Sequence, residues 1–141
     1  MNPERMRAVA DAIEESGRFM YSTWGGRLNL EGEWTEDGIS TTNELRDVGT
    51  LRHCGTTGCI AGWAATLAFE DKSYCVTRNQ MISDLAQDYL ELDHDEAQKL
   101  FLGQAMVYAG FYESDGKALG NATAIEAAKT LRMIADGEVK L

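Results

Sequence analysis

The chain has 141 residues, of which 44% are hydrophobic, and its formal net charge is −10 at pH 7. This length and apolar content predict one globular domain over residues 1–141, not a disordered chain. The 23 acidic side chains outnumber the 13 basic ones. This excess argues against non-specific nucleic-acid binding, which needs clustered Lys and Arg, and suits a basic protein partner.

The first predicted element is a helix starting at Asn2 and Pro3, because a capping side chain followed by proline is typical of a helix start. Gly17 is placed to end it. Residues 1–17 are amphipathic and rich in Glu and Arg, so they do not resemble a secretion signal. One apolar stripe runs along the predicted helix, formed by Met6, Val9, Ala10 and Ile13.

Residues 18–52 differ in character, because aromatic side chains alternate there with Gly, Ser and Thr. This composition favours short strands and turns, with a small hairpin over residues 28–34. Residues 38–50 show little periodicity and are expected to form a surface loop.

The second half of the chain is predicted to be helical. A helix is expected from Thr57, and its thin, small-residue face favours a central position in the fold. A further helix is expected to begin near Thr77. Two capping boxes predict the last two helix starts, and Gly137 can end the last helix. The pairs are Asp93 with Glu96 and Thr123 with Glu126.

These elements predict an α-rich fold (mainly α, α+β), with four to five helices around a central helix and a small β or irregular insert. No internal repeat or linker divides the chain. No apolar run approaches the roughly 18 residues of a membrane span. Three cysteines are an odd number for a disulfide framework, so we expect free thiols and a cytoplasmic setting.

The most informative motif lies between Cys54 and Cys59, where a Gly- and Thr-rich turn leads into the predicted central helix. Free N–H groups at a helix start attract anions, so the motif predicts a site for a phosphate-bearing ligand. It is not a P-loop, because the Gly-Lys-Ser/Thr element is missing. Alternatively, Thr56 or Thr57 merely caps the helix. The expected ligand-binding residues are Trp24, Arg52, His53, Gly55, Thr56, Thr57, Gly58 and Trp63.

The same motif also allows a reactive thiol, since a cysteine at a helix start can have a lowered pKa. A hydrolase also needs a nearby histidine, and only His53 and His94 are present. Cys54 and Cys59 lack a second Cys/His pair, so no metal site is assigned. We therefore assign no catalytic residue, metal ligand or cofactor, and favour a binding protein over an enzyme.

Several segments together resemble a group of small bacteriophage and prophage proteins that have no assigned activity. Their pattern is Phe-x-Met-x-x-Trp followed by Cys-Gly-Thr-x-x-Cys-x-Ala-Gly-Trp-Ala. Residues 19–24 resemble the first element, with the methionine shifted by one position, and residues 54–64 match the second. Residues 90–101 and 123–137 are similar to the later helices of that group. The resemblance implies a phage accessory protein in the host cytoplasm, and gives no residue a role.

From these features we expect a non-catalytic counter-defence protein that sequesters a phosphate-bearing host signalling nucleotide. One alternative is an acidic inhibitor that docks on a host defence protein. Another is a cysteine-dependent hydrolase that uses Cys54 or Cys59. Direct nucleic-acid binding and membrane association are not expected, and self-association is left open.

Overall fold

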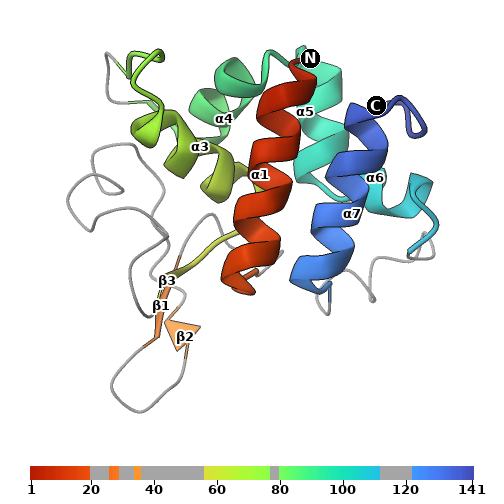
Figure 1. The fold of residues 1–141 in the computed structure, drawn as a ribbon, viewed down its shortest axis with the longest axis horizontal. Coiled ribbons are helices and arrows are strands. Elements are labelled where there is room, and N and C mark those ends of the chain that lie inside the picture. Colours follow the sequence, from red (N-terminus) through yellow and green to blue (C-terminus); the bar gives the residue numbers. More distant parts are fainter. Residues whose placement is uncertain (20–25, 29–33, 36–55, 77–79, 112–121) are drawn as a thin grey trace.

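The computed structural model describes residues 1–19, 26–28, 34–35, 56–76, 80–111 and 122–141. Six helices and three short strands lie within these ranges, which confirms the predicted α-rich fold with its small β insert (Figure 1). The helices are α1 (Pro3–Ser16), α3 (Ile60–Glu70), α4 (Ile82–Leu90), α5 (His94–Phe101), α6 (Gln104–Tyr108) and α7 (Ala124–Ala135). The strands are β1 (Gly26–Leu28), β2 (Trp34–Thr35) and β3 (Thr56–Thr57).

Helix α1 begins and ends where the sequence predicts. The Asn2 side chain accepts a hydrogen bond from the backbone N–H of Arg5 at 3.2 Å, and Pro3 occupies the first helical position. Gly17 ends the helix with φ of 64°, a left-handed conformation that glycine adopts without steric cost. The predicted stripe of Met6, Val9, Ala10 and Ile13 is fully buried.

Helices α1 and α7 lie side by side along most of their length (Figure 1). Ion pairs join their exposed edges. Arg7 contacts Asp136 at 2.6 Å, and Arg132 contacts both Asp11, at 2.7 Å, and Glu14. Such exposed pairs are each worth about 0 to 1 kcal/mol, so burial of the apolar side of α1 contributes more to the stability than these ion pairs do.

The three strands form one small sheet in the order β2-β1-β3. Antiparallel pairing of Leu28 with Trp34 confirms the two sides of the predicted hairpin, whereas the expected turn residues 29–33 lie outside the described ranges. Strand β3 pairs with β1 through Gly26 and Thr57. The expectation that Thr57 begins the central helix is therefore wrong, because this pairing holds residues 56–57 in an extended conformation.

The central helix is α3, which starts at Ile60 after Cys59 in the N-cap position. Because Cys59 holds the N-cap position, and makes no capping hydrogen bond through its side chain, neither Thr56 nor Thr57 is the N-cap residue of this helix. Every α3 residue except Phe69 and Glu70 is buried. Because α3 packs against α1, α4 and α5, its expected central position is confirmed.

The later helices confirm both capping boxes and correct one boundary. Asp93 and Glu96 hydrogen bond reciprocally at the start of α5, and Thr123 and Glu126 do the same before α7. Helix α4 begins at Ile82 and not near Thr77, because Met81 has an extended backbone. The five-residue α6 was not predicted, since such a short helix shows no apolar period; it starts after Gly103, whose φ is 90°.

Candidate functional site

The start of α3, where the sequence predicts an anion site, is buried in the protein. Gly58 is buried and forms a parallel β-bridge with Phe19, and only 7% of the Cys59 side chain is exposed. Burial raises the pKa of the Cys59 thiol from 9.0 to about 11, although the backbone N–H groups of Gly62 and Ala61 act in the opposite direction. The thiol is therefore protonated near neutral pH, the reverse of what a nucleophile requires.

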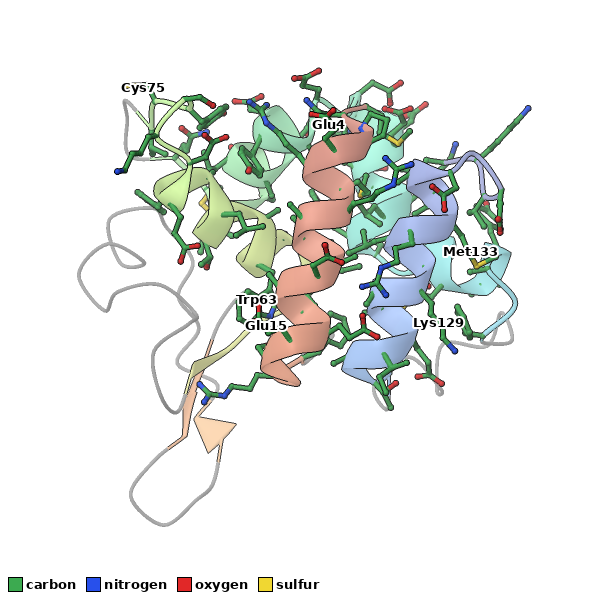
Figure 2. The ribbon with its side chains drawn as sticks, in the orientation of Figure 1. Glu4, Glu15, Trp63, Cys75, Lys129 and Met133 are labelled. Carbon is green, nitrogen blue, oxygen red and sulfur yellow. The ribbon has the colours of Figure 1, made fainter. Side chains whose placement is uncertain are left out.

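Trp63 belongs to the core and presents no exposed ring face on which a base could stack. Its indole Nε1–H donates a hydrogen bond to the carbonyl oxygen of Arg18 at 2.9 Å, which satisfies the one polar atom of this side chain. Figure 2 shows Trp63 beside α1, at the start of α3. In this structure, Trp63 therefore joins two helices.

The remaining predicted ligand-binding residues fall into two groups. Thr56 and Thr57 form β3, and two residues separate this strand from the start of α3. Trp24, Arg52, His53 and Gly55 lie outside the described ranges. The structure thus places only part of the predicted phosphate site, and that site stays a prediction.

The cysteines and histidines of the described ranges do not cluster. Cys75 is exposed at the outer edge of the loop after α3, well separated in Figure 2 from the buried start of that helix. His94 is exposed at the start of α5, as expected for a residue following the capping Asp93. Within the described part of the chain, no group of three or more His, Cys, Asp or Glu side chains could hold a metal ion.

No helix within the described ranges has the length and apolar character needed to span a bilayer.

A groove that the sequence did not reveal lies between α4 and α5, two helices that follow each other along the chain (Figure 1). Its volume is about 250 Å³. From α4 it is lined by Ser83, Asp84 and Gln87, and from α5 and its end by His94, Ala97, Gln98, Phe101 and Leu102. The α5 residues follow a helical i, i+3, i+4, i+7, i+8 spacing, so one whole face of α5 forms a wall. This spacing is visible in the sequence. There, however, a capped helix with an apolar core side explains it equally well, so it does not by itself indicate a groove.

The groove combines an apolar floor with polar edges. Ala97 is buried and Phe101 is half-buried, whereas Asp84, His94 and Gln98 are exposed. His94 and Gln98 lie one helical turn apart, and their side chains form a hydrogen bond. The distance between the two Nε2 atoms is 3.0 Å. Such a surface suits an apolar side chain with polar or charged neighbours.

A second, smaller hollow of about 130 Å³ adjoins the groove. Gln98 and Leu102 line both, so they form a ridge between the two. Leu102 is 66% exposed, the highest value among the large hydrophobic side chains of the described ranges. Asp95, Lys99 and Gln104 complete the second hollow.

Comparison with protein-family models, with curated proteins and with solved structures finds no match to this chain. The resemblance to phage proteins therefore stays a prediction.

Proposed function

We propose that the chain is a non-catalytic binding protein whose acidic surface docks on a basic protein partner. The observation that carries this proposal is the charge of the α4–α5 segment. Residues 82–101 contain six acidic side chains and a single lysine, within a chain whose net charge is −10. An acidic surface of this kind steers a basic partner toward it and disfavours acidic ones.

Three of these carboxylates are available to a partner. Asp84, Asp88 and Asp95 are exposed, and none of them forms a hydrogen bond or ion pair with another described residue through its carboxylate. Asp93 and Glu96 are instead engaged in the capping box, and Glu91 pairs with Arg5 at 3.2 Å. The segment thus holds structural carboxylates at the helix junction and unpaired ones on the exposed faces of α4 and α5.

The burial of Cys59 supports a binding role over a catalytic one. A cysteine hydrolase needs an accessible thiolate with a histidine in reach, and burial raises the pKa of this thiol to about 11. Cys54, the other cysteine considered for catalysis, lies outside the described ranges.

Nucleotide sequestration stays a prediction, and no described residue adds support to it. Trp63 is enclosed in the core, and the described backbone before α3 is buried at Gly58 and Cys59. In the setting that the phage resemblance implies, the basic partner would be a host defence protein.

The proposal is tested by capture followed by reconstitution. The tagged protein is exposed to a bacterial extract, captured proteins are identified by mass spectrometry, and each candidate is purified and titrated against the protein by calorimetry. We expect a basic partner whose affinity falls steeply between about 0.1 M and about 1 M salt, as the Debye length shortens from about 10 Å to about 3 Å. Failure of every purified candidate to bind, or binding that is insensitive to salt, would contradict the proposal.

A thermal-shift panel of linear and cyclic nucleotides separates the two binding functions. Under the protein-docking proposal we expect no nucleotide to change the melting temperature, whereas sequestration requires a shift. A ligand at about 100 times its Kd stabilises the folded state by about 2.7 kcal/mol, so a true nucleotide ligand would be seen easily. A clear shift with any nucleotide would favour sequestration over protein docking.

A further inference from the structure

We propose that the groove between α4 and α5 receives an amphipathic, basic α-helix of the partner protein. An apolar side chain of that helix enters the hollow, and its Lys or Arg residues pair with the carboxylates on the groove edges. This inference rests on the proposed function and assigns it a surface and a partner chemistry.

The size of the groove favours a side chain over a small-molecule ligand. Pockets for small molecules usually enclose about 300–1,000 Å³, and this one encloses about 250 Å³. The more buried of its lining residues, Ala97 and Phe101, are apolar, so the inserted group is expected to be apolar. A space of this size and apolar character suits one or two aliphatic or aromatic side chains.

The walls of the groove favour a helix over an extended peptide. Extended peptides are bound mainly through backbone hydrogen bonds to an exposed strand edge. Here both walls are helices, whose backbone groups are paired within α4 and α5. A guest must therefore be recognised by its side chains, which is how an amphipathic helix binds in a groove.

Leu102 supplies the apolar contact on the exposed side. This side chain is 66% exposed and separates the two hollows, so a helix laid across the groove would cover it. Burying a large exposed aliphatic side chain at the centre of an interface is a typical source of binding energy.

The charges around the groove determine which helices can bind. Asp84 lies on the α4 wall, and Asp95 lines the adjoining hollow. Lys99 is the single cation of residues 82–101. The exposed carboxylates would repel an acidic guest and attract a basic one, so charge favours a basic helix.

The test uses fluorescence anisotropy with a labelled synthetic peptide of about four helical turns, with Leu at i, i+3, i+4 and i+7 and Lys at flanking positions. One control peptide replaces each Leu by Ser at constant charge, and a second replaces each Lys by Gln. We expect the full-length protein to bind the first peptide at least about tenfold more tightly than either control. Equal binding of the first peptide and the Ser peptide, or no binding of the first, would overturn the groove assignment.

Matched variants locate the binding surface. Leu102→Ser is compared with Ile125→Ser, because Ile125 is 54% exposed on α7 and does not line the groove. Asp84→Lys is compared with Glu138→Lys, which changes the net charge equally at an exposed position outside the groove. We expect each groove variant to weaken binding about tenfold and each control less than about twofold, with unchanged circular dichroism. Equal losses in groove and control variants would overturn the assignment.

The outcomes separate this inference from the proposed function. If a purified basic partner binds but Leu102→Ser and Ile125→Ser behave alike, acidic docking stands and the groove assignment fails. If no purified partner binds, the proposed function itself fails. Sedimentation of the protein alone tests whether a second copy covers the groove: dimerisation that Leu102→Ser abolishes would overturn the partner-helix assignment.

Discussion

Trp63 donates its indole N–H to the carbonyl oxygen of Arg18, so the central helix is tied to the residue that follows the C-cap Gly17 of α1. Both the ring and its hydrogen bond are enclosed, because Trp63 is fully buried. This contact joins the start of α3 to the end of α1, two parts of the chain that are 45 residues apart.

Replacing Trp63 should separate the packing contribution from the hydrogen bond. We expect Trp63→Ala to lower the free energy of unfolding by about 3–5 kcal/mol, because it leaves a large cavity. Trp63→Phe should cost less, about 1–3 kcal/mol, through lost volume and an unpaired carbonyl oxygen. Urea unfolding followed by far-UV circular dichroism measures both. Tyr108→Ala, at a position that is 56% exposed, is the control, and a loss as large as that of Trp63→Ala would contradict this account.

Arg5 connects the start of α1 to the ends of α3 and α4. Its guanidinium lies 4.7 Å from the ring centroid of Tyr89 and 5.3 Å from that of Tyr74, and it donates to the Tyr89 carbonyl oxygen at 2.9 Å. We expect Arg5→Lys to destabilise the protein by about 1 kcal/mol, because an ammonium cannot both stack and donate in a planar fork. Thermal unfolding measures the change. Arg7→Ala, whose ion pair is more exposed, should cost less than about 0.5 kcal/mol, and the reverse order would rule out the stacking contribution.

The capping boxes predict a local effect on stability. Asp93→Ala and Thr123→Ala should each cost about 1 kcal/mol, since each removes the acceptor for the backbone N–H of the third helical residue. Urea unfolding provides the values. Asp95→Ala is the matched control, because Asp95 lies in the same helical turn without capping the helix. Equal losses for Asp93→Ala and Asp95→Ala would attribute the effect to charge alone.

The raised pKa of Cys59 predicts slow alkylation near neutral pH. With a pKa of about 11, the thiolate fraction at pH 8 is only about 0.1%. Cys75 is exposed, so iodoacetamide should modify it well before Cys59 in the folded protein. Peptide mass spectrometry after timed quenching assigns each site. Faster labelling at Cys59 than at Cys75 would restore a reactive thiol as a candidate.

The same pKa predicts how stability depends on pH. Because burial raises the folded-state pKa from 9.0 to about 11, the folded state favours the protonated thiol. This contribution is fully present below pH 9 and is lost as pH rises from 9 toward 11. Urea midpoints across that range should therefore decline more for the wild type than for Cys59→Ala. Equal declines of the urea midpoint in the wild type and in Cys59→Ala would show that the thiol has the same pKa in the folded and unfolded states.

Helix starts with a capping side chain could be predicted from the sequence, because the signal lies within a few residues. Asn2, Asp93 and Thr123 all cap helices as expected. The start of α3 could not be placed, since Thr57 is held in β3 by pairing with the distant Gly26. Nothing local in a Gly- and Thr-rich turn indicates such a partner.

The groove was not predictable for a related reason. Its α5 wall has a visible period, but the hollow exists only because α4 packs beside α5 at a particular spacing. The buried state of Trp63 also depends on tertiary contacts, since a tryptophan near a helix start suits a ligand site and a core equally well. The chemistry of the side chains could suggest candidate site residues. Which of the described candidates are exposed depends on tertiary packing.

The pairing of α1 with α7 has a consequence for how the chain is made. Asp11 and Arg132 are 121 residues apart in sequence. Helix α1 therefore cannot pair with α7 until the chain between them has been synthesised. In a nascent chain that lacks α7, the side of α1 that packs against α7 is therefore uncovered, although α3 and α4 can already contact α1. Closing so long a loop raises the contact order, so the docking of α7 on α1 should be a late and slow step of folding.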